Sequence, residues 1–164
     1  MRVPKVLVKI KSKTENSTIY YTEDGTMPKP ESSLIYKDPI LIDSTKIIRA
    51  IASKKDFLQT NVDTHSYIFP ASVIKQKGTN PKLPRTWGGK PADYEMDPEI
   101  VNDPDYSELM IPSLEALPSL SIAINPDDFY GASGIYQHPK SEGERWERAI
   151  SVELLTKDGT EKGF

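Results

Sequence analysis

Between residues 5 and 69 the sequence is a series of short β-prone runs separated by turn residues, and this pattern restricts the fold more than any other feature. Val6, Val8 and Ile10 alternate with lysines, which is the period of two expected of a strand with one buried face. The segment 47–52 is apolar on both faces and predicts a central strand. The regular spacing of these runs predicts an all-β immunoglobulin- or fibronectin-like β-sandwich over residues 5–69.

The character of the sequence changes after this region. Residues 70–112 are rich in proline and charge and offer few apolar side chains, so they predict an irregular, polar linker that lies against a neighbouring surface. Strand alternation returns at 120–124 and 150–154. Residues 113–164 therefore predict a second β-rich domain, of which only the N-terminal strands are present.

One short helical turn is predicted between these two strands. Asn125 is a suitable N-cap and Pro126 suits the first helical position. Asp127 and Asp128 favour the positive end of the helix dipole, and Gly131 can end the helix.

The strand at 150–154 leads into the turn-forming run 157–160, which contains Asp158 and Gly159 and predicts a hairpin. Only residues 161–164 follow, where the return strand is expected to start. A lone strand leaves its backbone hydrogen-bonding groups unsatisfied. We therefore expect the second domain to be incomplete, and the chain not to be a complete enzyme.

Composition excludes several classes of function. The net charge of −3 and the lack of a basic stripe argue against a nucleic-acid partner, and Lys9, Lys11 and Lys13 fit the solvated side of an edge strand. The absence of cysteine excludes disulfides and thiolate metal sites, and two histidines are too few for a multi-histidine zinc site. No stretch is long and apolar enough to span a membrane, and the first residues do not form a signal peptide.

Alternating acidic residues in the linker suggest a calcium loop. Pro98 stands where an EF-hand loop needs glycine, and Pro104 where it needs the bidentate glutamate, so an EF-hand is excluded. A looser calcium site stays open as an alternative, but solvated charges and helix-start aspartates are the favoured interpretation. The carboxylates concerned are Asp93, Glu95, Asp97, Glu99, Asp127 and Asp128.

Two further motifs have a functional and a structural interpretation. The run Gly131-Ala132-Ser133-Gly134 lacks the third glycine, the lysine and the following helix of a phosphate-binding loop, which favours a helix stop and turn. Arg145 and Arg148 flank Trp146 and Glu147. The functional interpretation is that the two arginines bind phosphate or carboxylate groups. The favoured interpretation is structural: the arginines belong to an ion-paired segment that leads into the next strand, and Trp146 packs in the core.

The remaining candidates are aromatic or histidine side chains. His65 alternates within a strand and is expected to be half-buried, and His138 lies in a polar loop, so no Ser/His/Asp set can be assembled. Four tyrosines of the sandwich offer a platform for sugar rings, although strands bury one face and some of the four must therefore be core. They are Tyr20, Tyr21, Tyr36 and Tyr67.

Three runs of the sandwich resemble the chitobiase/β-hexosaminidase C-terminal-type domain, a small fibronectin-associated module. They are Ile-Tyr-Tyr-Thr-Glu-Asp-Gly-Thr-Met-Pro at 19–28, Tyr-Lys-Asp-Pro-Ile at 36–40 and Ile-Arg-Ala-Ile-Ala at 48–52. The resemblance covers about residues 5–69. It implies a module appended to larger bacterial exported proteins, and carbohydrate as an alternative partner.

A second resemblance covers most of the remaining sequence. Five short runs are similar, in order and spacing, to the lead-in of spore-coat-protein-H-like (CotH) kinase proteins; they lie at 92–98, 120–122, 127–129, 134–136 and 145–153. The family's ATP- and divalent-metal-binding residues lie further downstream, so the resemblance implies no catalytic, cofactor-binding or metal-binding residue here.

Together these features predict a non-catalytic accessory module of a larger bacterial protein that is extracellular or on the cell surface, with the downstream domain of the same parent as its partner. Two alternatives stay open. The chain is the N-terminal part of an active CotH-like phosphotransferase, or the sandwich binds carbohydrate.

Overall fold

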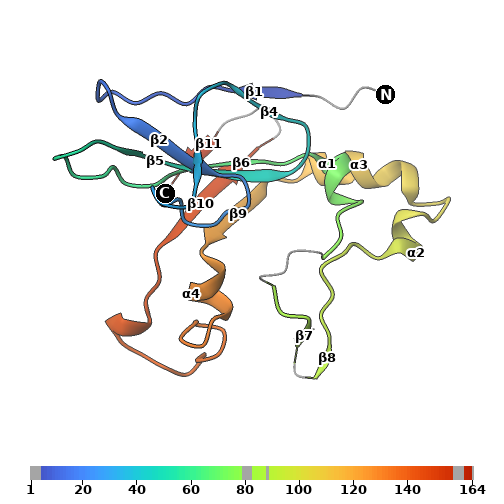
Figure 1. Cartoon of the computed structure of the whole chain (residues 1–164). Coiled ribbons are helices and arrows are strands. Elements are labelled where there is room, and N and C mark those ends of the chain that lie inside the picture. The colour runs from blue at the N-terminus through green and yellow to red at the C-terminus, as the bar shows by residue number, and fades with distance from the viewer. Residues whose placement is uncertain (1–4, 79–82, 88, 157–160, 164) are drawn as a thin grey trace. The chain divides into compact units, whose positions relative to one another are not determined.

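The computed structural model describes residues 5–78, 83–87, 89–156 and 161–163 (Figure 1). The chain divides into two units, Met1–Phe69 and Pro70–Phe164, and each is described by itself. Strands dominate, and the helices are short, so the predicted β-rich class is confirmed. Among the described residues, no helix has the length and apolar character needed to cross a lipid bilayer.

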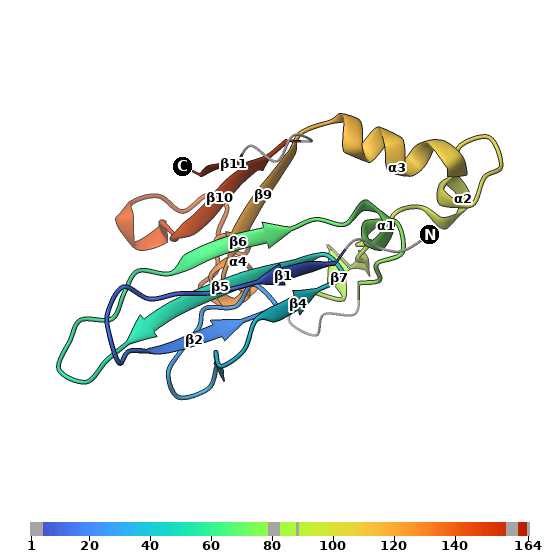
Figure 2. The ribbon, with the colours of Figure 1, turned by 90° about the horizontal axis from the view of Figure 1, so that it is seen from above.

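Unit 1 contains two antiparallel sheets. The larger has the strand order β3-β2-β5-β6 and the smaller pairs β1 with β4. Figures 1 and 2 show the small sheet lying over the large one, as in a sandwich. The strands are β1 Val6–Val8, β2 Thr18–Thr22, β3 Leu34–Ile35, β4 Ile40–Ile42, β5 Lys46–Ser53 and β6 Asp63–Tyr67.

The central strand of the large sheet is β5, as the sequence predicts. It pairs with β2 on one side and with β6 on the other, and its four middle residues are buried. A strand paired on both sides and packed beneath a second sheet is expected to be apolar over most of its length. Arg49 is the exception to that rule, with only 2% of its surface exposed.

The core of unit 1 lies between the two sheets. Ile42 is fully buried and packs with Ile40, Ile48 and Phe69. Burying one such aliphatic side chain contributes about 1.5–3 kcal/mol, so this cluster is the main source of the unit's stability. Five half-buried residues complete it: Val8, Ile10, Tyr21, Tyr36 and Tyr67.

The turn after β2 depends on a glycine. Gly25 has a φ of +74°, in the left-handed region that side chains disfavour, and it is buried. Asp24 accepts hydrogen bonds at Oδ1 from the amide and hydroxyl of Thr26, at 3.1 and 2.6 Å. This side-chain turn fixes the chain reversal that the sequence predicts at 23–26.

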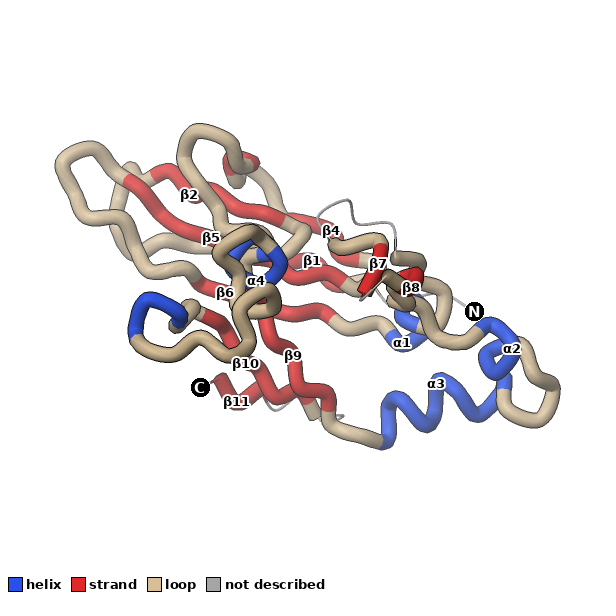
Figure 3. Tube along the Cα trace, turned by 90° about the horizontal axis from the view of Figure 1, so that it is seen from below, coloured by secondary structure: helices blue, strands red, loops and turns tan. Residues whose placement is uncertain are grey.

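Unit 2 combines a three-stranded antiparallel sheet, in the order β11-β10-β9, with a two-stranded hairpin and short helices (Figure 3). The elements are α1 Pro70–Val73, β7 Thr86–Trp87, β8 Lys90–Pro91, α2 Pro98–Val101, α3 Ser107–Ala116, β9 Ser119–Ile124, α4 Pro126–Tyr130, the 3-10 helix η1 Glu144–Trp146, β10 Ile150–Leu155 and β11 Glu161–Gly163.

The segment 70–112, expected to be irregular, contains α1, α2, the β7–β8 hairpin and the first part of α3. Helix α3 continues across residues 112 and 113, where the linker was expected to end. Helix α3 was not predicted from the sequence, because Pro112 lies inside it and none of its residues is buried. Helix α2 begins conventionally, since Asp97 accepts a hydrogen bond from the amide of Glu99 at 2.8 Å.

The strand at 150–154 is not a lone strand. It forms β10, which pairs with β9 along six residues, from Ile150↔Ile124 to Leu155↔Ser119. On its other side β10 pairs with β11, as the predicted hairpin requires. The predicted turn at 157–160 lies outside the described residues. The expectation of a lone strand is therefore wrong, because alternation identifies a strand without identifying its partner. The expectation that the second domain is incomplete stays a prediction.

Helix α4 has the predicted bounds but not the predicted caps. Asn125 and Pro126 occupy the N-cap and first helical positions, yet the Asn125 side chain makes no capping bond. Gly131 ends the helix with a φ of −62°, outside the left-handed region. Glycine is needed there for space, because a Cβ at Gly131 would lie 2.4 Å from the carbonyl oxygen of Asp127.

Candidate functional site

A shallow groove of about 180 Å³ lies at the side of the sandwich, between the β1 segment and strands β5 and β6. Lys9 and Lys11 lie on one side, and Asp63 and His65 on the other. The Nε2 atom of His65 is 3.5 Å from Oδ1 of Asp63, and 47% of the histidine side chain is exposed, which agrees with the expectation that about half of it is buried. Ligand pockets usually measure about 300–1,000 Å³, so this groove accommodates only a small polar group.

The sandwich tyrosines do not form a common platform. Tyr21, Tyr36 and Tyr67 pack against the core, and the rings of Tyr21 and Tyr36 meet edge-on with centroids 6.3 Å apart. Tyr20 is the next residue to Tyr21 in β2 and therefore lies on the opposite face of the sheet. Burial raises the pKa of Tyr21, and the nearby Glu23 raises it further. The tyrosines are mainly structural.

The carboxylates of the 93–99 segment form local turns. Asp93 accepts a hydrogen bond from the amide of Glu95, and Asp97 caps α2. Within the part of the chain that the structure describes, no group of three or more His, Cys, Asp or Glu side chains is placed to hold a metal ion.

The 131–134 turn presents carbonyl oxygens. The Gly131 amide donates to the Asp127 carbonyl and the Gly134 amide to the Gly131 carbonyl, so both are used inside the turn. The Ala132 carbonyl faces Nε2 of His138 at 2.8 Å. A phosphate-binding loop needs amides that point outward. The geometry therefore fits the helix stop and turn.

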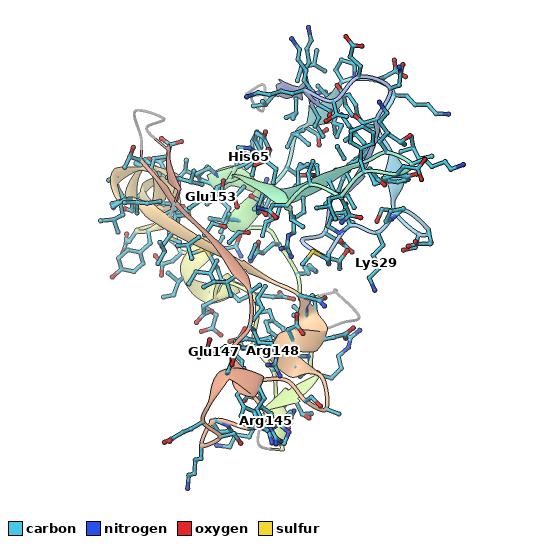
Figure 4. All side chains as sticks on the ribbon, turned by 90° about the vertical axis from the view of Figure 1, so that its left-hand side faces the viewer. Lys29, His65, Arg145, Glu147, Arg148 and Glu153 are labelled. Carbon is cyan, nitrogen blue, oxygen red and sulfur yellow. The ribbon has the colours of Figure 1, made fainter. Side chains whose placement is uncertain are left out.

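Arg148 contacts three segments, namely the 131–134 turn, the segment 145–147 and helix α4 (Figure 4). Its Nη2 donates to the Ser133 carbonyl at 2.5 Å, and its Nη1 donates to the carbonyls of Arg145 and Glu147 at 2.9 Å each. Its Nε lies 3.8 Å from Oδ1 of Asp128 in α4. These contacts use the guanidinium within the protein, and only 15% of the side chain is exposed.

Trp146 lies in the same cluster and is half-buried. Its ring centroid is 4.4 Å from that of His138, and the guanidinium of Arg145 lies 4.9 Å from its ring. These contacts connect the arginines, the turn and the indole, which fits a structural role. Trp146 is not among the buried core residues, however, so the expectation that it packs in the core is wrong.

A second, wider pocket of about 550 Å³ lies in unit 2 around Tyr94, a residue of the run 92–98 that carries part of the CotH resemblance. The Tyr94 hydroxyl donates to the Pro84 carbonyl at 2.9 Å. Burial raises the pKa of Tyr130, and Tyr94 raises it further. Arg85, Asp93 and Glu95 also line the pocket, so its wall carries both charges.

Two buried charges escaped the sequence analysis. Arg49 is 2% exposed and Glu153 is 4% exposed. Each charged residue interrupts an apolar strand. Such an interruption is the signal that could have identified them, because a charged side chain is seldom buried unless it has a partner.

Comparison with known proteins bears on unit 1. Residues 8–67 match the family model described as Fn3 associated. No curated protein matches the chain, and no solved structure does. The match supports the fibronectin-associated resemblance of the sandwich, and the CotH resemblance stays a prediction.

Proposed function

We propose that this chain is the non-catalytic accessory part of a larger exported or cell-surface bacterial protein, in which the sandwich spaces or supports a CotH-like kinase domain. The observation that carries the proposal is the Fn3-associated match at residues 8–67, which coincides with a sandwich that closes its own core around Ile42. A small domain with its own core can support a neighbour without contributing to its chemistry.

The kinase part of the proposal is supported by the five sequence runs of residues 92–153 that resemble the CotH lead-in. On this proposal, ATP and a divalent metal bind to the neighbouring domain. The alternative is that the chain is the N-terminal part of an active phosphotransferase, in which residues of unit 2 complete the kinase domain.

Carbohydrate binding by the sandwich has less support. Three of the four candidate tyrosines pack on the core, and the groove beside β6 is small. Sugar sites usually present aromatic faces to solvent.

The test uses the longer polypeptide that the encoding gene specifies, with and without residues 1–69. An accessory role predicts unchanged phosphotransfer per folded molecule and a midpoint of thermal unfolding lower by several degrees, since about 1 kcal/mol shifts the midpoint of a 150–250-residue domain by about 2–4 °C. Unchanged thermal unfolding after the deletion would contradict the supporting role. Phosphotransfer by residues 1–164 alone would contradict the accessory assignment.

A further inference from the structure

The loop between β5 and β6 carries two large hydrophobic side chains at its tip, residues 54–59. Phe57 and Leu58 are 61% and 98% exposed, and every residue from Lys55 to Asn61 is exposed. Removing another part of the chain cannot lower the exposed fraction of a side chain, so these values are lower limits for unit 1 by itself. Single exposed hydrophobic residues are common on protein surfaces, whereas contiguous ones mark sites of protein or membrane contact.

The backbone fixes the position of this tip. The Phe57 amide donates to the Lys54 carbonyl at 3.1 Å, and Ala52 and Thr60 bond to each other twice across the base of the loop, at 3.1 and 2.9 Å. Asp56 has a φ of +67°, in the left-handed region that few residues other than glycine adopt. The two hydrophobic side chains are therefore presented to solvent by a closed, hydrogen-bonded turn.

Basic side chains surround the tip. The β1–β2 loop lies beside it, because Thr18 pairs with Ser53 and the Lys54 ammonium donates to the Glu15 carbonyl at 2.9 Å. Figure 2 shows both loops at the left-hand end of the sandwich. Residues 11–16 and 54–59 together contain four lysines and two acidic residues, in a chain whose net charge is −3. The lysines are Lys11, Lys13, Lys54 and Lys55.

The tip lies at the end of the sandwich away from both chain connections. At the other end, Val6 at the start of β1 pairs with Ile42, and the Phe69 amide donates to the Thr45 hydroxyl at 2.9 Å. Strand β5, with eight residues, separates the two ends by roughly 25 Å. Unit 2 follows Phe69 directly, so it would have to fold back along the sandwich to cover the tip.

The size and chemistry of the tip favour a bilayer over a protein partner. A stable interface between proteins uses about 20–30 residues on each side, and the two loops offer about half that number. A bilayer needs no complementary shape, since its interface takes up apolar side chains and its anionic headgroups attract lysines. The Lys54 ammonium lies 4.7 Å from the centre of the Phe57 ring, so charge and apolar surface lie side by side.

We infer that the β5–β6 tip is a peripheral membrane-binding site, which inserts Phe57 and Leu58 into the interface of a bilayer rich in anionic lipid while the surrounding lysines contact the headgroups. This inference goes beyond the proposed function and does not depend on it. It requires neither a kinase domain nor a supporting role of the sandwich.

The test measures binding of residues 1–164 to vesicles. Vesicles of phosphatidylglycerol and phosphatidylcholine in equal amounts are the probe, and vesicles of phosphatidylcholine alone are the uncharged comparison. We expect binding to the anionic vesicles that weakens as the salt concentration rises, because salt screens the lysines. Phe57→Gln/Leu58→Gln should lower the partition coefficient by about tenfold or more, and Lys13→Gln/Lys55→Gln by about fivefold for each lysine removed.

The matched control is the double variant Leu7→Gln/Leu41→Gln. These two side chains lie opposite each other in β1 and β4 and are 58% and 51% exposed. The control therefore also removes two exposed hydrophobic side chains from unit 1, but away from the tip, and should keep the partition coefficient. Circular dichroism and thermal unfolding establish that each variant is folded.

A labelled cysteine identifies the side chain that enters the bilayer, since the chain contains no cysteine of its own. An environment-sensitive fluorophore on Leu58→Cys should shift its emission to shorter wavelength when anionic vesicles are added. The same fluorophore on Leu41→Cys should not respond. This measurement leaves Phe57 in place and tests the inference even if the double variant of the tip fails to fold.

Three results would overturn the inference. They are no binding of the unmodified chain to anionic vesicles, binding that Phe57→Gln/Leu58→Gln leaves unchanged, and a label on Leu58→Cys that is shielded from water before vesicles are added. Shielding independent of protein concentration would identify unit 2 as the cover, and shielding that grows with concentration would identify a second copy. The result is separate from the deletion test of the proposed function, which measures phosphotransfer and thermal unfolding.

Discussion

Arg49 donates a hydrogen bond from Nη1 to the carbonyl oxygen of Gly25 across 3.2 Å, and both residues are buried. The central strand β5 thereby holds the turn that follows β2. Hydrogen bonding from a charged donor to a buried carbonyl is worth more than an exposed ion pair, because water does not replace it when it is lost.

Replacing this arginine should therefore cost stability. We expect Arg49→Met to lower the free energy of unfolding by about 1–3 kcal/mol, since the Gly25 carbonyl loses a buried donor. Lys46→Met is the matched control on the same strand. It removes the pair with Glu23, in which both side chains are 30% exposed, and should cost less than about 1 kcal/mol. Urea denaturation of the whole chain measures both, and equal losses would contradict the assignment.

Gly134 should tolerate no side chain. A Cβ there would lie 2.4 Å from the Phe129 carbonyl oxygen, and backbone atoms cannot move aside. We expect Gly134→Ala to loosen the turn that returns to α4 and to speed hydrogen exchange of the Ile135 and Tyr136 amides, which donate to the carbonyls of Asp128 and Phe129.

Ser133→Ala is the control for that substitution, because Ser133 is exposed and contributes to the cluster only through its backbone carbonyl. Its exchange pattern should match that of the unmodified chain. Exchange-coupled mass spectrometry of peptides spanning 128–138 distinguishes the two variants. Unchanged protection in Gly134→Ala would show that the turn has room to adjust.

The two arginines around Trp146 should differ in their contribution to stability. Arg148→Gln removes donors to three carbonyls and the contact with Asp128, and should cost about 1–3 kcal/mol. Arg145 is exposed and its guanidinium lies 4.9 Å from the Trp146 ring, so Arg145→Gln should cost about 0.5–1 kcal/mol or less. Tryptophan fluorescence during denaturation reports both. A larger effect of Arg145→Gln would contradict the geometry.

The stability of the sandwich should fall in alkaline solution. Burial raises the pKa of Tyr21 above the value of 10.0 for a free tyrosine, and Glu23 adds to the increase. The folded state therefore keeps the proton at a pH where the unfolded state loses it. Stability is full below the unfolded pKa and declines as pH rises through about 10 and above.

Tyr21→Phe removes this titration and should make the decline between about pH 9 and 11 less steep. Tyr20→Phe is the matched control for loss of a tyrosine hydroxyl from β2, because Tyr20 lies on the opposite face of the strand from Tyr21. Denaturant unfolding at a series of pH values measures both slopes. Identical slopes for Tyr21→Phe and the unmodified chain would contradict the prediction.

The sequence was most informative where one local rule determined the structure. Alternation of Val6, Val8 and Ile10 located the β1 region, and the apolar run of 47–52 located the central strand, because one face or both faces of a strand must be buried. Asp24 and Gly25 located a turn because few residues accept its backbone angles.

Other features depend on contacts that a local pattern does not contain. The pairing of β9 with β10 joins segments separated by α4 and η1, and nothing in either strand identifies the other. Helix α3 has a proline at Pro112 and buries no side chain, so it lacks the amphipathic pattern that reveals a helix. Arg49 is buried on the face of β5 opposite to Ile48, where it donates to the carbonyl of Gly25, and nothing in the local pattern of β5 indicates that contact.

The register of unit 1 has a consequence for the order in which it folds. Ala50 pairs with Asp63 across a short connection, whereas Val6 must reach Ile42 across most of the domain. Closing the longer loop carries the larger entropic cost, so β5 and β6 meet early and β1 joins late. During that interval the first strand is unpaired, and the exposed Lys9, Lys11 and Lys13 beside it discourage association with other nascent chains.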